Sequence, residues 1–455
     1  MLNIFNPIEN IALLLQLKYT NMKRFIFLIL FIFSVQYGFT QNTTDTSSTD
    51  KMEWFKDAKL GIFIHWGIYS VNGIAESWSF FNGKISYEDY LKQLDGFTAS
   101  NYDPEQWAKL IKESGARYAV ITSKHHDGVA LWDSKYSDLN VVKKTPAGRD
   151  LLKPFVNNLR KYGIKVGLYY SLLDWSHPDY PNFTRKKKRY TQDSVRWERF
   201  VKFNFGQIGE IMDNYNPDLL WFDGGWEQSS EKWHAKEIRD FLLKKNPGII
   251  INSRLRGYGD YATPEQGLPV YGPKNKYWEL CMTMNDSWGY QGRDNNYKTP
   301  YQIIRIFSDV ISLGGNLLLD IGPKSDGTIP EQQQFLLKEL GRWTKKYDKA
   351  IFNTRKGISR YHFAGPSTMS KDGKTLYLFV RGKPNGPVML KGIKNKIENI
   401  YDVNSGEKLD YEIKLKASWS KVPGVVFIDI PEKYLDKYIT VIAVKLDGKV
   451  DLYNK

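Results

Sequence analysis

The residue best suited to chemistry in this sequence is Asp223, which ends a run of apolar residues. The run, Leu219–Phe222, is followed by Asp223 and then by two glycines. A carboxylate at the end of a buried strand is typical of catalytic acids in α/β barrels. Asp-Gly is also a common turn dipeptide, so a structural role is the alternative. Trp221 and Trp226 favour catalysis, because aromatic faces beside a carboxylate suit a sugar ring and a turn does not need them.

Polar and aromatic side chains follow the other predicted strands at corresponding places. They are His65 and Trp66 after the first strand, His125, His126 and Asp127 after the second, Tyr169 and Tyr170 after the third, Trp221 and Asp223 after the fourth, and Asn252 and Arg254 after the fifth. The carboxyl ends of barrel strands converge on one mouth, so these residues should share a site. Three of the six histidines in the chain occupy such positions. This grouping predicts a functional cluster.

Such a set of residues could bind either a divalent metal or a ligand rich in hydroxyl groups. Metal sites of barrel amidohydrolases usually carry a His-x-His pair on the first strand, and here His65 stands alone. His125 and His126 are adjacent, so on an extended chain they point in opposite directions. We therefore expect no metal and no other cofactor. Neutral His, Tyr and Arg donors around one Asp favour the recognition of sugar hydroxyls.

Hydrolysis of a glycoside requires a second carboxyl group beside Asp223. Two candidates, Glu265 and Glu279, follow on later predicted loops. Each also has a structural interpretation. Glu265 lies in Thr-Pro-Glu, which resembles the start of a helix, and Glu279 could be a buried carboxylate paired with Arg254. On the residues alone, both remain candidates.

Alternating apolar and amphipathic segments between residues 51 and 348 must position these side chains. The predicted strands are Leu60–Trp66, Tyr118–Thr122, Lys165–Tyr170, Asp218–Phe222, Ile249–Asn252 and Asn316–Ile321. The predicted helices are Pro104–Ser114, Leu151–Tyr162, Arg196–Tyr215, Thr299–Ser312 and Pro330–Trp343. Repeated strand–helix units predict parallel strands covered by helices. No Gly-rich phosphate loop follows the first strand, so a (β/α)8-like barrel is favoured over a dinucleotide-binding sheet.

Residues 349–455 follow a different pattern. The apolar runs there are Thr375–Val380, Val388–Leu390, Val425–Ile430 and Tyr438–Leu446. Turns rich in Gly, Pro, Asn and Lys separate them, and no helical periodicity intervenes. The segment therefore predicts a C-terminal antiparallel β-sandwich domain. The fold class is thus α/β, with a barrel followed by a sandwich.

The N-terminus resembles an export signal. Met22-Lys23-Arg24 precedes the short apolar run Phe25–Phe33, which is too short to span a bilayer comfortably. We assign residues 1–40 to an N-terminal extension and signal peptide, with cleavage expected before Gln41. The protein should then be exported to the periplasm or the medium, with no membrane span after cleavage.

Charge and composition narrow the choice of partner only a little. The formal net charge is +15, and about +13 without residues 1–40. A basic exported protein could meet nucleic acid, an anionic surface or an acidic polysaccharide. No zinc-ligand spacing or nucleic-acid-binding motif is present, so nucleic acid is not expected. The 14 Trp and 29 Tyr residues suit a carbohydrate-active protein, and the single Cys281 is expected to be a small buried apolar residue.

Taken together, the motifs resemble those of glycoside hydrolase family 29, the α-L-fucosidases. The matching stretches are Lys59–Gly67, Lys124–Gly128, Gly167–Ser171, Trp221–Gly224, Ser287–Tyr290 and Gly315–Pro323. They cover about residues 51–355 in order, and the β-rich tail resembles the family's C-terminal sandwich. The resemblance implies a retaining enzyme that removes α-linked L-fucose from glycans or oligosaccharides by double displacement. The alternatives are a fucose-binding protein without catalysis and a metal-dependent hydrolase.

The resemblance also implies roles for individual residues. Asp223 matches the nucleophile, and Glu265, which follows Arg254 as in one branch of the family, is favoured over Glu279 as the acid/base. The substrate-binding residues that it implies are His65, Trp78, His125, His126, Tyr170, Trp221, Arg254 and Trp288. Many relatives carry a Glu directly before the tryptophan that corresponds to Trp78. Here Ser77 holds that place and Glu76 precedes it.

Overall fold

The computed structural model describes residues 51–270, 273 and 275–453. The predicted extension and signal peptide, residues 1–40, lie outside the described residues. Within the described part of the chain, no helix combines the length and the apolar character needed to cross a membrane.

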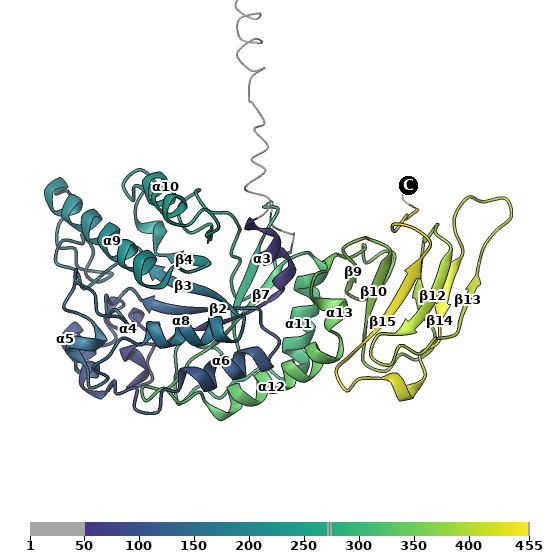
Figure 1. Ribbon diagram of the computed structural model, residues 1–455, viewed down its shortest axis with the longest axis horizontal. Coiled ribbons are helices and arrows are strands. Elements are labelled where there is room, and N and C mark those ends of the chain that lie inside the picture. The colour runs from purple at the N-terminus through teal and green to yellow at the C-terminus, as the bar shows by residue number, and fades with distance from the viewer. Residues whose placement is uncertain (1–50, 271–272, 274, 454–455) are drawn as a thin grey trace, which may run out of the picture. The chain divides into compact units, whose positions relative to one another are not determined.

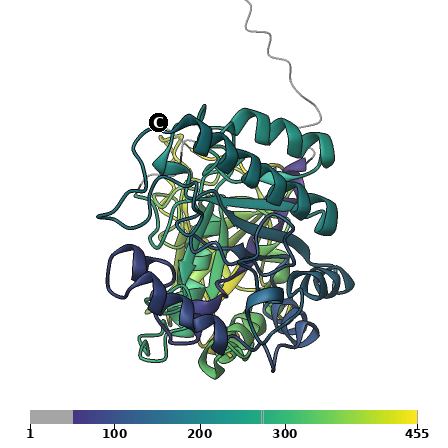
Figure 2. The same ribbon diagram turned by 90° about the vertical axis from the view of Figure 1, so that its left-hand side faces the viewer.

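A sheet of parallel strands forms the centre of the barrel region (Figures 1 and 2). Its strands are β1 Leu60–Ile64, β2 Tyr118–Lys124, β3 Lys165–Ser171, β4 Leu219–Asp223, β5 Ile250–Ile251, β6 Glu279–Thr283 and β7 Asn316–Ile321. The order across the sheet is β5-β4-β3-β2-β1-β7-β6. The first strand therefore pairs with both the second and the last, and the sheet curls. Figure 2 shows helices around these strands.

A short irregular segment occupies the gap between the edge strands β5 and β6. Tyr261 bridges to Asn252 after β5, Ala262 bridges to Trp278 before β6, and Glu265 bridges to Cys281 within β6. All these bridges are parallel. The segment thus takes the eighth position without forming a regular strand. The predicted (β/α)8-like barrel is confirmed in this form.

The six predicted strands are present, and a seventh, β6, was missed. Glu279, expected on a loop, is instead the first residue of this strand. Its sequence, Glu-Leu-Cys-Met-Thr, contains no Val, Ile or aromatic residue, so its strand propensity is weak. Glu265 was considered as a possible helix start, but its segment is extended and bridged, as described above.

Helices cover the parallel sheet, and the longer ones, except for Ala235–Lys245, lie where the periodicity predicted them. The longer ones are α6 Pro104–Glu113, α8 Leu152–Lys161, α9 Ser194–Tyr215, α10 Ala235–Lys245, α11 Pro300–Ser312 and α12 Glu331–Lys346. The short ones are α3 Glu53–Ala58, α4 Trp78–Phe81, α5 Tyr87–Leu91, α7 Val141–Lys144 and α13 Asp348–Ile351, with 3₁₀ turns η1 Ile68–Ser70, η2 Lys92–Gly96, η3 Gly225–Glu227 and η4 Glu432–Tyr434. The Asp103 side chain caps α6 and Thr299 forms a capping box on α11, each followed by Pro at the first helical position.

The apolar faces of these helices pack against the sheet. Trp107 and Ile111 of α6 and Phe155 and Leu159 of α8 are buried. Burial of each large apolar side chain contributes about 1.5–3 kcal/mol to folding. This packing holds the strands in register, and thereby fixes the positions of the residues at their carboxyl ends.

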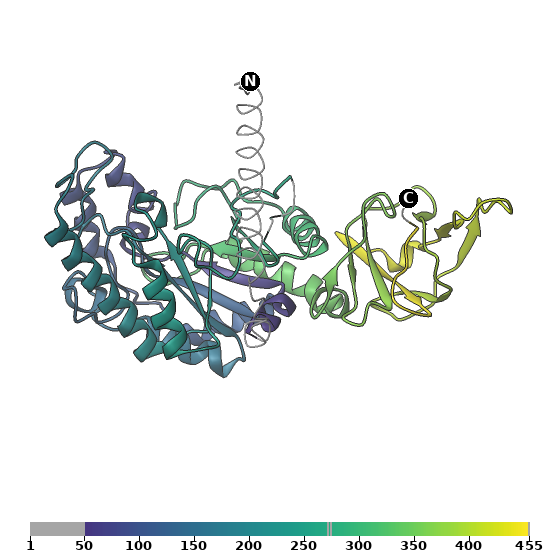
Figure 3. The same ribbon diagram turned by 90° about the horizontal axis from the view of Figure 1, so that it is seen from above.

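Two antiparallel sheets follow the barrel (Figures 1 and 3). Their strands are β8 Arg355–Lys356, β9 Ser367–Met369, β10 Thr375–Arg381, β11 Val388–Leu390, β12 Ile397–Asp402, β13 Tyr411–Lys414, β14 Val425–Ile428 and β15 Ile439–Leu446. Five strands form one sheet in the order β12-β15-β10-β9-β8, and three form the other, β11-β14-β13. Figure 3 shows these strands, green to yellow, as a group of their own.

Side chains join the two regions. Arg342 and Lys346 of α12 both pair with Asp436, at 2.9 and 3.0 Å, and the Trp343 indole donates to the carbonyl of Ile439 at 2.8 Å. In the barrel region, Asp309 of α11 accepts from two arginines of the antiparallel region. These bonds are buried or half-buried, so they fix the antiparallel sheets against α11 and α12.

Candidate active site

A cavity of about 310 Å³ lies at the carboxyl ends of the barrel strands. Fourteen residues line it: Phe63, His65, Glu76, Trp78, His125, His126, Tyr169, Trp221, Asp223, Trp226, Arg254, Glu265, Cys281 and Trp288. The convergence of strand ends predicted from the sequence therefore brings these residues to one place. Of the predicted catalytic and substrate-binding residues, only Tyr170 and Glu279 are absent from the lining. Of the other strand-end residues expected there, Trp66, Asp127 and Asn252 are also absent.

Asp223 ends β4 and is held on both carboxylate oxygens. The Tyr169 hydroxyl donates to Oδ2 at 3.0 Å, and Arg254 Nη1 donates to Oδ1 at 2.9 Å. His126 Nε2 lies 3.8 Å from Oδ2. These donors fix the orientation of a carboxylate whose side chain is only 11% exposed.

Arg254 links the two carboxylates of the cavity. Its Nη1 binds Asp223, and its Nη2 donates to Glu265 Oε2 at 2.6 Å. The guanidinium also lies over the Trp221 ring, 4.4 Å from its centroid. One planar side chain thus holds both acids side by side. Glu265 is the more open of the two, with 41% of its side chain exposed.

Three histidines form a wall of the cavity, each held through Nδ1. The partner of His65 is Asp320, at 2.6 Å, and the partner of His126 is Ser171, also at 2.6 Å. His125 bonds in the same way to Ser77, the residue that departs from the family pattern. Burial lowers the pKa of all three imidazoles well below the usual value. Neutral rings of fixed orientation can donate to or accept from sugar hydroxyls.

Aromatic rings form the remaining walls. Trp221 stacks against Tyr169 with an interplanar angle of 19° and ring centroids 5.6 Å apart. Trp78 lies parallel to Trp226, at 13° and 6.3 Å. On the other side, Trp288 packs against His65 at 4.9 Å. The cavity therefore combines flat apolar surfaces with polar groups, as sugar-binding sites require.

Glu279 does not reach the cavity, because it lies at the beginning of β6 in the barrel interior. It is fully buried. Tyr118 donates to its Oε2 at 2.5 Å and the Trp221 indole donates to its Oε1 at 3.0 Å. Burial raises the pKa of this carboxyl to about 7. The pairing with Arg254 suggested by the sequence is replaced by these two neutral donors.

Tyr170, implied as a sugar-binding residue, points away from the cavity. Its hydroxyl donates to Asn204 at 2.8 Å and to Gln207 at 3.0 Å, both on α9. The neighbouring Tyr169 lines the cavity instead. Successive side chains of a strand point to opposite faces, and both faces of this strand are buried. The sequence therefore lacked the polar alternation that would have identified the inward tyrosine.

A family model described as alpha-L-fucosidase matches residues 32–349. The chain belongs to the α-L-fucosidase family. Its members are glycoside hydrolases of family 29, as the sequence resemblance implied. The enzyme class and the barrel fold predicted from the sequence are thereby confirmed.

Relatives and solved structures of α-L-fucosidases match most of the chain. The enzyme of Dictyostelium discoideum is 30% identical over 447 residues, which cover 90% of this chain and 94% of the relative. Isoenzyme 1 of Paenibacillus thiaminolyticus has 34% identity and a TM-score of 0.81, covering 88% of this chain and all of that one. A family 29 enzyme of Bacteroides thetaiotaomicron has 29% identity and a TM-score of 0.77, covering 88% and 96%. That structure is described as a trapped covalent intermediate with 2-fluoro-fucosyl fluoride, in a Glu-to-Gln mutant.

Several residues of this α-L-fucosidase-family cavity were not predicted as site residues. They are Phe63, Glu76 and Cys281. Cys281 is buried as expected, yet it also contributes to the cavity wall. Tyr169, from the strand-end grouping, and Trp226, from the aromatic residues around Asp223, line the cavity as the sequence indicated. Phe63 lies within an apolar strand, and nothing in the sequence marked it as a site residue.

Glu76 holds a loop of the cavity in place. Its carboxylate accepts from the backbone N–H of Gly289 at 2.7 Å, next to Trp288. Burial raises the pKa of Glu76 to about 7. Ser77 and Glu76 thus have different partners: the serine orients His125, and the glutamate anchors the Trp288 loop.

Metal ligation was an alternative for the histidine cluster. Among the residues that the structure describes, no group of three or more His, Cys, Asp or Glu side chains is placed to hold a metal ion. Each cavity histidine instead has one nitrogen bonded within the protein.

Proposed function

We propose that this chain hydrolyses terminal α-linked L-fucose with retention of configuration, using Asp223 as nucleophile and Glu265 as general acid/base. The observation that carries the proposal is the contact of one guanidinium, Arg254, with both carboxylates inside the cavity. Retaining glycosidases require two carboxyl groups placed close together, one to attack and one to transfer protons.

The reaction would proceed in two displacements. In the first, an Asp223 oxygen attacks the anomeric carbon while Glu265 gives its proton to the departing glycosidic oxygen. In the second, the Glu265 carboxylate takes a proton from water, which attacks the anomeric carbon and releases Asp223. The covalent intermediate named for the Bacteroides relative supports this mechanism.

The surroundings of Asp223 suit a nucleophile. Tyr169 and Arg254 hold its oxygens, so little reorganisation is needed before attack. Neutral His65, His125 and His126 can bind the sugar hydroxyls without adding a competing charge. Trp288 offers an apolar face to the sugar.

The surroundings of Glu265 suit an acid/base. Its side chain is open to solvent, as a group that protonates a leaving alcohol and then activates water must be. A neighbouring cavity of about 520 Å³ is lined partly by Trp226, Arg254 and Arg256. It shares Trp226 and Arg254 with the first cavity, so it offers space for the leaving group. Glu279 is sealed from both.

Hydrolysis of aryl α-L-fucoside, with aryl glycosides of other sugars for comparison, tests the activity. Proton NMR of the first product formed tests the stereochemistry, since retention predicts α-L-fucose. Inactivation by 2-fluoro-fucosyl fluoride followed by peptide mass analysis should place the label on Asp223. First release of β-L-fucose would contradict retention, and a label on another residue would contradict the assignment of the nucleophile.

Two controls separate the other classes of function. A fucose-binding protein would bind L-fucose and release no aryl alcohol from any fucoside. A metal-dependent hydrolase would lose its activity with chelator and regain it with added metal. A panel of α-1,2-, α-1,3-, α-1,4- and α-1,6-fucosyl oligosaccharides then defines the linkage that is cleaved.

We also propose that the protein is exported, on the basis of the basic and apolar segments that begin at Met22. Expression of the full chain in a bacterial host, followed by fractionation, tests this. Export predicts a mature N-terminus near Gln41 in the periplasm or medium. A cytoplasmic protein that keeps residues 22–40 would contradict it.

A further inference from the structure

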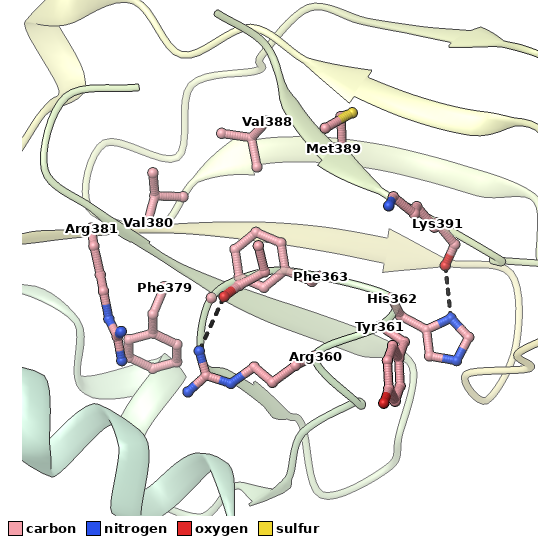
Figure 4. A pocket seen from close by; sticks show the side chains of 12 residues that line it. Arg360, Tyr361, His362, Phe363, Phe379, Val380, Arg381, Val388, Met389 and Lys391 are labelled. Atoms are coloured by element: carbon pink, nitrogen blue, oxygen red, sulfur yellow. Dashed lines mark hydrogen bonds between the residues drawn. The ribbon is translucent and has the colours of Figure 1, made fainter. Parts of the chain in front are cut away.

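A second cavity, of about 320 Å³, lies in the antiparallel region, far along the chain from the catalytic residues. Figure 4 shows it between the loop of residues 360–365 and strands β10 and β11. These strands belong to the two different antiparallel sheets. The cavity thus sits where the loop closes over the junction of the sheets.

The floor of this cavity is apolar and tightly packed. Phe363 and Val380 are buried, and Phe379 is fully buried. A Cβ atom added to Gly365 would lie 2.4 Å from the carbonyl oxygen of Phe379 and 2.5 Å from the Phe363 ring. The loop therefore packs directly on β10, and the cavity is preformed.

The rim of the cavity presents an aromatic face to solvent. Tyr361 is 92% exposed, and Met389, across the cavity in Figure 4, is 48% exposed. The hydroxyl of Tyr361 has no hydrogen bond to the described residues, so its ring is free to cover a ligand. An exposed ring beside a preformed cavity is the kind of surface on which the C–H face of a sugar stacks.

Positive charge surrounds the same cavity. Arg360, Arg381 and Lys391 line it, and its lining contains no Asp or Glu. Both arginines donate to a single carboxylate oxygen of Asp309, at 2.5 Å each, so one positive charge of this group is not neutralised. The buried Nε of Arg381 has no hydrogen-bond partner among the described residues.

Lys391 adds a second unneutralised charge. Within the described chain, its Nζ forms no ion pair, while its backbone is held by His362. Figure 4 shows the two arginines at one end of the cavity and Tyr361, His362 and Lys391 at the other. A ligand lying across the cavity would therefore meet positive charge at both ends.

The charge of the C-terminal region as a whole has the same sign. Residues 351–455 contain 19 Lys and Arg against 11 Asp and Glu, a formal net charge of +8. This is more than half of the +15 of the chain, in under a quarter of its length. Such a field raises the local concentration of anionic ligands.

We propose that this cavity binds an acidic saccharide, with one sugar ring on Tyr361 and its sulfate or carboxylate group beside Lys391 or the arginines. Planar guanidinium groups and lysine pair with both kinds of anion. The family of the chain makes a saccharide the fitting source of the anion. Bound there, an anionic glycan would be held on the same chain as the catalytic cavity, which raises its effective concentration at that cavity.

Direct binding measurements on the full chain test the proposal, without reliance on the catalytic assignments. The probes are a sulfated fucan, the same fucan after desulfation, and alginate, which carries carboxylates. Tyr361→Ala should weaken binding of the anionic probe about tenfold, and Lys391→Gln about fivefold. Turnover of a small aryl fucoside should be unchanged in both variants.

Two matched variants show whether the cavity itself is responsible. Trp419→Ala removes another exposed aromatic ring, and Lys449→Gln removes another exposed charge, both outside the cavity lining. Each should change the affinity less than twofold. Binding of sulfated fucan but not alginate would identify sulfate as the anion, and the reverse would identify carboxylate.

Several results would overturn the proposal. One is equal weakening by Lys449→Gln and Lys391→Gln, which would indicate only diffuse attraction. Another is equal binding of the desulfated fucan, and a third is no binding of any of the three polymers. Tighter binding of a DNA oligonucleotide that is lost in Tyr361→Ala would assign the cavity to nucleic acid instead.

Discussion

The mouth and the interior of the barrel each hold a carboxyl group that the sequence offered as the acid/base, and the two sites differ in their partners. At the mouth, Glu265 bonds to the charged Arg254 and is open to solvent. In the interior, Glu279 bonds to the neutral Tyr118 and Trp221 and is fully buried. The two segments are neighbours, since Glu265 bridges to Cys281 of the same strand, β6.

This difference means that a carboxylate near the proposed nucleophile, Asp223, is not for that reason alone placed for catalysis. A proton donor to a leaving group needs access to that group and to water, and Glu265 has it. A buried carboxyl with two neutral donors instead fixes its neighbours. Glu279 holds the Trp221 indole, whose ring forms a cavity wall. The mouth is therefore expected to carry the chemistry, and the interior to position it.

The largest effect is expected at the mouth, from Asp223→Asn. The amide keeps the size of the side chain but cannot attack the anomeric carbon, so kcat should fall by at least about 10⁴-fold. The circular dichroism spectrum should be unchanged. Full turnover by this variant would remove Asp223 from the mechanism and would place the nucleophile elsewhere in the cavity.

Glu265→Ala should lower activity less than Asp223→Asn does. The size of the loss should depend on the leaving group of the substrate. A positioned acid contributes about 10²–10⁴-fold, so hydrolysis of a fucosyl oligosaccharide should fall within that range. An aryl fucoside with an acidic phenol needs little protonation and should be affected less. Azide is a nucleophile that needs no general base, so it should attack the glycosyl-enzyme in place of water, release Asp223, restore turnover and yield fucosyl azide. Azide rescue of Glu279→Ala without rescue of Glu265→Ala would reverse the roles assigned to the two glutamates.

Most residues at the mouth of the barrel could be predicted from the sequence, because the carboxyl ends of parallel strands meet at one place. Apolar runs located the strands, and the residues after them gave His65, His126, Asp223 and Arg254. The placement of Glu279 could not be predicted. Strand β6 is poor in β-branched residues and contains no aromatic residue, so the sequence indicates a loop there.

The sequence also could not show which side chains of β3 face the cavity. Tyr169 and Tyr170 are both fully buried or nearly so, one against the cavity and one against α9. A strand buried on both faces shows no polar alternation, and a shift of one residue exchanges the faces. Only the packed structure distinguishes them.

These two tyrosines therefore provide a matched pair of variants. Tyr169→Phe removes a hydrogen bond to Asp223, and a bond to a charged group is worth about 1.5–3 kcal/mol, so kcat/KM should fall about 10- to 100-fold. Tyr170→Phe removes bonds to Asn204 and Gln207 and the bond accepted from the buried Lys124, and should lower stability by about 1–3 kcal/mol, with kcat/KM nearly unchanged. Steady-state kinetics and urea unfolding measure the two quantities. A kinetic loss confined to Tyr170→Phe would place that residue in the site after all.

The smallest effect on activity is expected in the interior, from Glu279→Gln. The amide can accept from the Trp221 indole through its oxygen and donate to the Tyr118 hydroxyl through its nitrogen, so the wall of the cavity should stay in place. Turnover should remain within about threefold of the parent enzyme. A loss as large as that of Glu265→Ala would return Glu279 to the chemistry.

The same variant should change the dependence of stability on pH. Burial raises the pKa of Glu279 from 4.5 to about 7 in the folded protein, so the folded state holds a proton that the unfolded state has lost. The stabilising effect of that proton is complete below about pH 4.5 and is lost as the pH rises through 7. Over this range the parent should lose about 3 kcal/mol relative to Glu279→Gln, since one unit of pKa equals about 1.4 kcal/mol. Urea unfolding of both proteins at pH 5 and pH 8 measures the difference. Glu76 titrates in the parent and in the variant alike, so its contribution cancels in the difference between them. If the stabilities of the two proteins instead changed in parallel with pH, the interior carboxyl would be ionised at pH 5 and would not be the neutral partner of Trp221.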